Sequence, residues 1–270
     1  TDIAILETGL GGKLDSVTTC NPELVVFTPI SLDHKEILGN TIEKITLEKA
    51  GIIKENTPVF SSKQKIKAKK ILLKKADELK APIYFCNYKQ KIKPKFLKGK
   101  HQQENAQLAF QIISFLYNYK KDIIINAIEN TKWPGRYQII KDSPYIIFDV
   151  GHNEEGINVF LKQYKREKIK GKKYLILVLQ HRKKITKVKN KIEKLFDFII
   201  CSETENKFSM NYNDLYKIFN SEKTIKIKNI DEAIEKIDKK LDKDDSLAII
   251  GSHYLGNSIK RVYKKSFDIL

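Results

Sequence analysis

Cysteine and long apolar runs are scarce in this sequence, and each of these shortages argues against a class of protein. The three cysteines, Cys20, Cys86 and Cys201, lie far apart and form no CxxC pair. A disulfide scaffold or a zinc ribbon is therefore not expected, and a reducing cytoplasm fits best. No apolar run approaches the ~18–20 residues of a transmembrane helix, and no signal peptide is recognised, so we expect no membrane partner.

The chain has 270 residues, of which 41% are hydrophobic and 10% aromatic. This composition is that of a chain with buried cores and not of a disordered one. At roughly 150 residues per domain, the length favours two domains. The run Ile3-Ala4-Ile5-Leu6 reads as a buried strand directly after Thr1. We therefore expect a chain that lacks its natural start.

The formal net charge of +18 suggests nucleic acid or an anionic surface as a partner. The lysines, however, are spread along the whole chain, and no zinc finger, RRM signature or basic-plus-heptad pattern is present. The densest stretch, residues 63–80, keeps a helical apolar stripe with lysine on the other faces. A solvated helix face and a polyanion-binding surface both remain open, and we favour the first and expect no nucleic acid partner.

Apolar strands alternate with helices along the chain, which indicates an α/β fold with parallel sheets. The Pro-Gly step in Trp133-Pro134-Gly135-Arg136 breaks regular structure, so the domain boundary is placed there. The expected strands cover residues 3–7, 24–28, 58–61, 82–85, 145–149, 174–179, 198–201, 224–227 and 246–250. The expected helices cover residues 41–50, 64–80, 103–119, 154–164, 187–195, 212–219, 230–241 and 255–265.

Ligands of parallel α/β sheets bind beyond the carboxyl ends of the strands. Four of the five histidines follow expected strands, which favours a site at those loops. The polar residues at these strand ends include Glu7, Asp33, His34, Asp149, His152, His181, Ser252 and His253.

The turn Gly9-Leu10-Gly11-Gly12 follows Glu7 and allows a ligand to approach the backbone closely. It is no Walker A loop, because Leu14 and not Ser or Thr follows Lys13. The turn also reads equally well as a tight strand-to-loop connection. Glu7 and His34 offer a carboxylate and an imidazole, a pair that suits a divalent cation. Lys49, read alone, is a surface lysine near the end of a short helix.

Several long motifs come in a fixed order and spacing up to about residue 156. They are ETGLGGKLDSVTT, SLDHKEILGNTIEKITLEKAGIIK, HQQENAQLA and WPGRYQIIKDSPYIIFDVGHNEEG, with a looser match that ends at Gly251-Ser252-His253. The set resembles the folylpolyglutamate synthase / dihydrofolate synthase family of the Mur-type ATP-dependent ligases. Three long motifs in order are much more specific than a lone glycine loop.

The resemblance implies a two-domain α/β fold. Residues 1–136 would be a central P-loop ATPase domain with a parallel sheet, lacking its N-terminal P-loop segment, and residues 137–270 a C-terminal Rossmann-like domain. It implies a monomer in which ATP phosphorylates a carboxylate of dihydropteroate or tetrahydrofolate. The amine of L-glutamate then attacks the acyl phosphate, with Mg²⁺ screening charge. Without the P-loop segment, the chain alone is expected to bind ATP poorly and to be inactive.

The resemblance also implies roles for individual residues. Glu7, His34 and a carbamylated Lys49 would hold Mg²⁺, with Lys49 and His34 as catalytic residues. Carbamylation makes an anionic ligand from a lysine and requires its neutral amine. Asn105, at a helix start, together with Arg136, Asp149 and His152, would bind ATP. Asp15 and Ser252 would contact substrate. Domain closure would assemble these residues and exclude water.

The chain departs from the family pattern at two further places. Lys13 stands where the family usually has arginine, which keeps the charge but loses the planar fork. Gln180-His181-Arg182-Lys183-Lys184 replaces a stretch that usually carries Asp-Lys-Asp. These departures leave two alternatives open: another Mur-type ligase with a different acid, and a non-catalytic basic remnant.

Overall fold

The computed structural model describes residues 2–87, 89–181, 183 and 185–265. The chain forms two compact units in it. The first comprises Thr1–Lys93 with Lys100–Glu129, and the second comprises Pro94–Gly99 with Asn130–Leu270. The boundary expected after residue 136 lies inside the second unit. The roles assigned to the two domains stay predictions.

A sheet of three short parallel strands organises the first unit. Its elements are β1 (Val25–Phe27), β2 (Val59–Ser61) and β3 (Ile83–Phe85), in that order, with α2 (Ile42–Ala50) and α3 (Ile66–Glu78). Val25 pairs with Val59, which pairs with Ile83. The two helices bury Ile45 and Leu72 in one core with these strands. The lysine-rich α3 thus places an apolar stripe inward, as its periodicity predicts.

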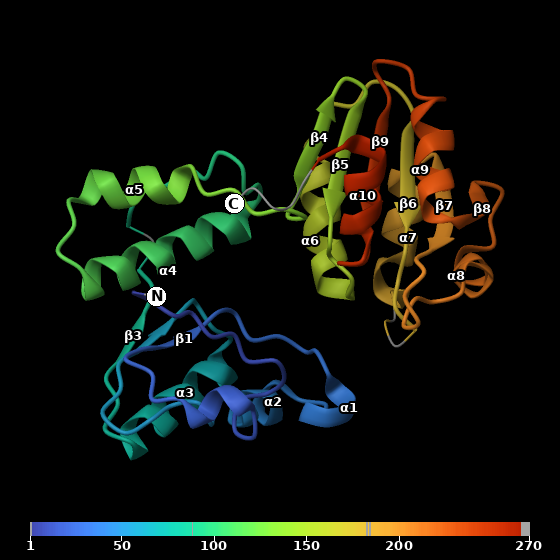
Figure 1. Cartoon of the computed structure of the whole chain (residues 1–270). Helices are drawn as coiled ribbons and strands as arrows, with labels where there is room; N and C mark the ends of the chain where they lie inside the picture. The colour runs from blue at the N-terminus through green and yellow to red at the C-terminus, as the bar shows by residue number, and fades with distance from the viewer. Residues whose placement is uncertain (1, 88, 182, 184, 266–270) are drawn as a thin grey trace. The chain divides into compact units, whose positions relative to one another are not determined.

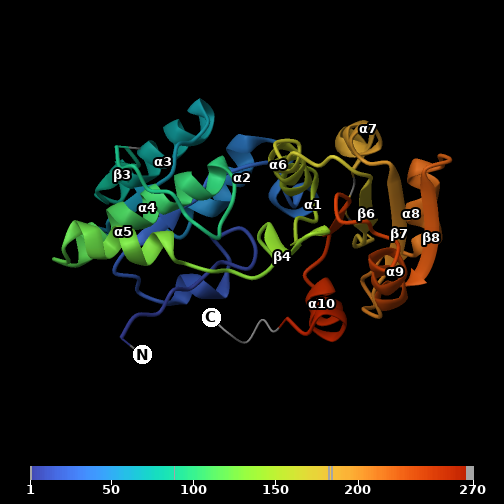
Figure 2. The same ribbon diagram turned by 90° about the horizontal axis from the view of Figure 1, so that it is seen from above.

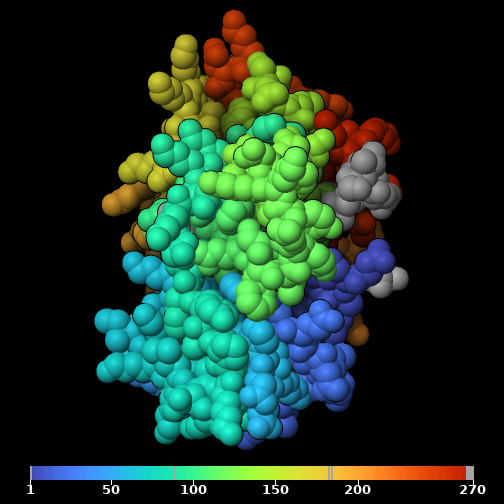
Figure 3. Space-filling model, turned by 90° about the vertical axis from the view of Figure 1, so that its left-hand side faces the viewer, coloured from blue at the N-terminus to red at the C-terminus, as the bar shows by residue number. Residues whose placement is uncertain are grey.

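Two further helices belong to the first unit, α4 (Lys100–Leu116) and α5 (Lys121–Glu129). They pack against each other around Phe110 and Ile124. Helix α4 also reaches the sheet, because its Leu108 is buried with Phe60 of β2. Figure 3 looks onto the outer surface of these two helices, which is coloured green.

The strand expected at residues 3–7 is wrong, since the structure gives these residues no regular structure. Ile5 is 93% exposed and pairs with no described strand. A short apolar run is compatible with a strand, but a strand forms only where a neighbour supplies hydrogen bonds. The following residues form a short 3₁₀ helix, η1 (Ser16–Thr19), and a one-turn helix, α1 (Lys35–Leu38), which the sequence analysis missed.

The second unit contains a six-stranded sheet. Its strands are β4 (Gln138–Asp142), β5 (Tyr145–Asp149), β6 (Lys173–Leu177), β7 (Phe198–Glu203), β8 (Thr224–Asn229) and β9 (Ser246–Ile250). They lie in the order β4-β5-β9-β6-β7-β8. All neighbours are parallel except β4, which runs antiparallel to β5. The last strand in sequence therefore lies inside the sheet, between β5 and β6 (Figure 1).

Helices cover both faces of this sheet. They are α6 (Glu154–Tyr164), α7 (Thr186–Leu195), α8 (Tyr212–Phe219), α9 (Ile230–Asp238) and α10 (Leu255–Tyr263). The first three share one apolar core with the sheet, and the last two share another. Figure 2 shows α7 on one side of the strands and α9 and α10 on the other. Strands buried on both faces read as continuous apolar runs, and this explains why the sequence predicts them well.

In the described part of the chain, no helix is both long enough and apolar enough to cross a membrane. The side chains of Cys20, Cys86 and Cys201 are free, and Cys86 and Cys201 are buried. Burial raises the pKa of the Cys86 thiol to about 11 and that of Cys201 to about 12. These two thiols therefore act as small apolar side chains.

Candidate functional site

The glycine-rich turn packs directly onto the end of helix α2. The backbone N–H of Lys13 donates to the Glu48 carbonyl at 2.8 Å. A Cβ atom at Gly12 would lie 2.7 Å from the Lys49 carbonyl oxygen, and one at Gly51 would lie 2.5 Å from Lys13 Cα. Both contacts are too short for a side chain. The two glycines therefore let the turn approach the helix end that carries Lys49.

Asp15 holds the turn in shape. Its two carboxylate oxygens accept hydrogen bonds from the backbone N–H groups of Leu10, at 2.9 Å, and Val17, at 3.1 Å. The bond from Leu10, followed by that from Val17, lowers the pKa of Asp15, and the positive charge of Lys49 adds to this. The carboxylate thus stays ionised and lies within the electrostatic reach of Lys49. Its contact with a substrate stays a prediction.

The three predicted metal ligands all belong to the first unit. The side chains of Glu7 and His34 are exposed, and that of Lys49 is partly buried. His34 precedes α1 with a φ of 50°, in the left-handed region. No group of three or more His, Cys, Asp or Glu side chains within the described residues is arranged to hold a metal ion. A carbamylated Lys49 would add an anionic carbamate to the carboxylate of Glu7 and the imidazole of His34. These three donor groups together suit a divalent cation.

Asn105 does not lie at a helix start. Helix α4 begins at Lys100, so Asn105 is in its second turn, and its exposed side-chain amide donates to Gln102 Oε1 at 3.3 Å. The start expected at residue 103 is thus three residues late. The proposed nucleotide contact of Asn105 would therefore come from a helix side.

The Pro-Gly loop of the second unit is tied to the end of strand β5. The carbonyl of Gly135 accepts a hydrogen bond from Val150 N at 2.9 Å. Asp149 accepts from Tyr137 N at 2.8 Å through one oxygen and from Gly151 N at 2.7 Å through the other. Burial raises the pKa of Asp149, against the opposing effect of these bonds. Asp149 thus joins the Pro-Gly loop to the loop after β5. Arg136, which lies between Gly135 and Tyr137 in the first of these loops, has an exposed side chain.

Two of the predicted histidines meet at the carboxyl ends of neighbouring strands. The rings of His152, after β5, and His253, after β9, have centroids 5.2 Å apart. Ser252, beside His253, is buried, and its hydroxyl accepts a hydrogen bond from Tyr254 N at 3.2 Å. The structure therefore gives Ser252 a role in shaping the turn before α10. A substrate contact of Ser252 stays a prediction.

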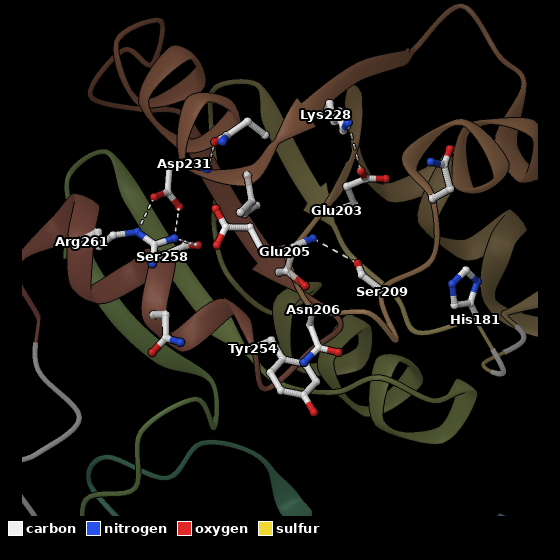
Figure 4. Close-up of a pocket in the computed structure, with 15 residues that line it drawn as sticks. His181, Glu203, Glu205, Asn206, Ser209, Lys228, Asp231, Tyr254, Ser258 and Arg261 are labelled. Atoms are coloured by element: carbon white, nitrogen blue, oxygen red, sulfur yellow. Dashed lines mark hydrogen bonds and ion pairs between the residues drawn. The ribbon is translucent and has the colours of Figure 1, made fainter.

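The structure describes Gln180, His181 and Lys183 of the atypical stretch after β6, whereas Arg182 and Lys184 lie outside the described residues. His181 lines a pocket of about 720 Å³ in the second unit. The pocket lies where β7 and β8 end and where α9 and α10 begin (Figure 4).

Charges of both signs line this pocket. Arg261 of α10 contacts Asp231 of α9 through two nitrogens, at 2.5 and 3.1 Å, and Lys228 lies 4.0 Å from Glu203 (Figure 4). Burial opposes the ionisation of Asp231, but the bonds from Arg261 and Ser258 outweigh it and lower its pKa. The pocket therefore holds two cationic side chains, each beside a carboxyl group.

Two further residues that line the pocket, Thr204 and Glu205, carry polar groups that could bind a ligand. The Oγ1 atom of Thr204 is buried and has no hydrogen-bond partner among the described residues. Glu205 is exposed and lies close enough to Arg261 to raise the pKa of its guanidinium, though less than Asp231 does. The sequence analysis missed this pocket, because its residues come from four separate loops and helix starts. Of the lining residues, the sequence singles out His181, as a histidine that follows an expected strand.

Comparison with known proteins identifies the relatives of this chain. Residues 135–253 match the family described as Mur ligase, glutamate ligase domain. The chain is 26% identical over 291 aligned positions to the dihydrofolate synthase/folylpolyglutamate synthase of Bacillus subtilis, covering 97% of this chain and 68% of that protein.

Solved structures share the fold. E. coli FolC in complex with DHPP and ADP has a TM-score of 0.82 at 21% identity, covering 95% of this chain and 64% of that one. The bifunctional folylpolyglutamate synthase/dihydrofolate synthase from Yersinia pestis, complexed with AMPPNP and Mn ion, has a TM-score of 0.81 at 20% identity, covering 95% and 65%. The chain thus spans about two thirds of the length of these proteins.

Proposed function

We propose that this chain belongs to the folylpolyglutamate synthase and dihydrofolate synthase family of Mur-type ligases and that it takes part in the ATP-dependent joining of L-glutamate to dihydropteroate or a folate. A carboxylate is a poor electrophile. Transfer of the γ-phosphoryl group of ATP to it gives an acyl phosphate and ADP. The glutamate amine then attacks the carbonyl carbon, phosphate leaves, and an amide forms.

The pocket of the second unit is the observation that best supports an amino acid substrate. Glutamate carries two carboxylates and one ammonium group. Arg261 and Lys228 offer cationic donors for the carboxylates, and Glu205 offers an acceptor for the ammonium group. The unpartnered Thr204 hydroxyl adds a further hydrogen-bonding group. This arrangement suits a zwitterion with an acidic side chain.

Nucleotide binding is assigned to residues of both units. In the second unit, the exposed guanidinium of Arg136 would bind phosphate oxygens, and Asp149 and His152 would also contact the nucleotide. In the first unit, Asn105 would contact the nucleotide. Glu7, His34 and carbamylated Lys49 would hold Mg²⁺, which supplies positive charge against the triphosphate when bound.

The same proposal includes a cytoplasmic monomer. The free cysteines support a reducing compartment, because two of them are buried as thiols in the core. The monomer is the family's expected state, and sedimentation of the purified chain measures it directly.

Glutamate binding tests the proposal on this chain. In ¹⁵N-labelled protein, L-glutamate is expected to shift the backbone amide signals of residues 203–209 and 228–231. Arg261→Ala should weaken binding about 10- to 100-fold, since a charge-assisted hydrogen bond contributes ~1.5–3 kcal/mol. Lys236→Ala, which removes one positive charge from α9 outside the pocket, is the matched control. Equal losses in both variants, or no shifts at millimolar glutamate, would remove the pocket from the proposal.

A further inference from the structure

Tyr137, directly after Arg136, has a backbone conformation that bulky residues rarely adopt. Its φ is 50°, in the left-handed region, and Gly135 two residues earlier has a φ of 71°. A bulky residue keeps such a conformation only where its surroundings determine it strongly, and such positions cluster at functional sites. The contacts that hold Tyr137 in this conformation therefore also restrain the backbone of its neighbour, Arg136.

Three contacts hold Tyr137. Its ring is buried and lies 5.4 Å from the ring of Phe160 on α6, measured between centroids. Its backbone N–H donates to Asp149 Oδ2 at 2.8 Å. Its hydroxyl donates to Glu167 Oε1 at 3.1 Å, beyond the end of α6. The loop is thus fastened at its backbone to β5 and through its side chain to α6.

Glu167 is itself held in place. The same oxygen, Oε1, accepts a hydrogen bond from Gln163 Nε2 at 3.3 Å, one helical turn earlier. The Tyr137 hydroxyl therefore meets an acceptor that α6 has already oriented. Because a rotation of the backbone at residue 137 would break this bond, the bond also restrains the backbone of the preceding residue, Arg136.

We propose that Tyr137 is a positioning residue, braced by Glu167, that presents the exposed Arg136 guanidinium to an anionic ligand. The ligand class rests on the proposed function, in which Arg136 binds the phosphates of a nucleotide. The alternative is a purely structural tyrosine that only fills the core. The two differ in one respect: a positioning residue acts through Arg136, and a core residue does not.

A double-mutant cycle on MgADP binding separates these roles. Tyr137→Phe keeps the ring and removes the hydroxyl, and it is expected to weaken binding about three- to tenfold. Arg136→Ala should weaken it at least as much. In the Arg136→Ala background, Tyr137→Phe should then have no further effect. An equal loss in both backgrounds would overturn the proposal, because the tyrosine would not be acting through the arginine.

Conservative variants supply the controls. Glu167→Gln keeps an acceptor for the Tyr137 hydroxyl and should restore near-normal affinity, whereas Glu167→Ala should match Tyr137→Phe. Tyr164→Phe removes another buried hydroxyl from the same core, bonded to Ser246 at 2.5 Å, and should leave MgADP affinity unchanged. An equal loss in Tyr164→Phe would identify a general effect of core packing and contradict the proposal.

If the unmodified chain binds no nucleotide, that result counts against the proposed function alone. A measurement without ligand then still tests the positioning role of Tyr137. The ¹⁵N heteronuclear NOE of residues 135–138 reports how rigid the loop is. Tyr137→Phe should lower it, and Tyr164→Phe should not. Unchanged values in Tyr137→Phe would overturn the positioning role.

Discussion

Gly12 and Lys49 meet backbone to backbone, with no room for a side chain between them. A Cβ atom at residue 12 would lie 2.7 Å from the Lys49 carbonyl oxygen. The conformation of the glycine-rich turn and the end of helix α2 are therefore coupled, although the two segments are far apart in sequence. Of the three predicted metal ligands, Lys49 is the one whose backbone this contact holds.

Gly12→Ala should destabilise the first unit by about 1–3 kcal/mol, because the added methyl group forces two backbone segments apart. Gly9→Ala is the matched control, since its nearest atom would be Asp15 Oδ2 at 3.6 Å, an ordinary contact. Urea unfolding of the chain measures both. A cost for Gly9→Ala as large as that for Gly12→Ala would contradict the close approach.

Lys49 should form a carbamate in ¹³C-labelled bicarbonate. The product is an anion, which a divalent cation stabilises, so the ¹³C carbamate signal should grow when Mg²⁺ is added. Lys49→Arg should abolish the signal. Lys44→Arg, at an exposed position of the same helix, should keep it. A signal that survives Lys49→Arg would assign the modification to another lysine.

The pKa values of Asp149 and Asp15 should be shifted in opposite directions from the ordinary carboxyl value. Burial raises the pKa of Asp149, so the folded chain binds this proton more readily than the unfolded chain. Its contribution to the free energy of unfolding is therefore largest below the ordinary carboxyl pKa and falls as the pH rises through the raised value. Hydrogen bonds lower the pKa of Asp15, so its contribution is present above the ordinary pKa and is lost as the pH falls.

Carboxyl ¹³C titration by NMR measures both groups in one sample. Asp149→Asn and Asp15→Asn assign the two signals. An Asp149 midpoint at or below that of Asp15 would show that the hydrogen bonds at Asp149 outweigh its burial.

Tyr164→Phe should cost about 1–3 kcal/mol, because it leaves the buried Ser246 hydroxyl without its partner. The double variant Tyr164→Phe/Ser246→Ala should recover part of this loss, since neither polar group then remains. Urea unfolding of the single and double variants gives the coupling free energy. Strict additivity of the two substitutions would contradict the hydrogen bond.

The sequence predicts best those elements whose signal is local. Strands β5 and β9 and helices α6 and α8 begin and end where expected. Asn153, for example, caps α6 by accepting a hydrogen bond from Gly156 N. An apolar run or a capping residue marks each of these boundaries without help from distant residues.

The misses come from interactions that a single segment does not encode. Strand β4 is mostly exposed and antiparallel, so it has no continuous apolar run. Residues 3–7 have the apolar run but no strand neighbour. The pocket around Arg261 combines loops far apart in sequence, and Tyr137 gains its contacts only when Asp149 and Glu167 are brought to it. Long-range packing decides all four.

The position of β9 has a consequence for synthesis on the ribosome. Strands β5 and β6 do not pair with each other, because β9 lies between them. Until residues 246–250 have left the exit tunnel, the nascent second unit consists of two separate strand groups with unpaired edges. Those edges are open to mispairing and to chaperones. The two strand groups can therefore join into one sheet only after β9 has been made.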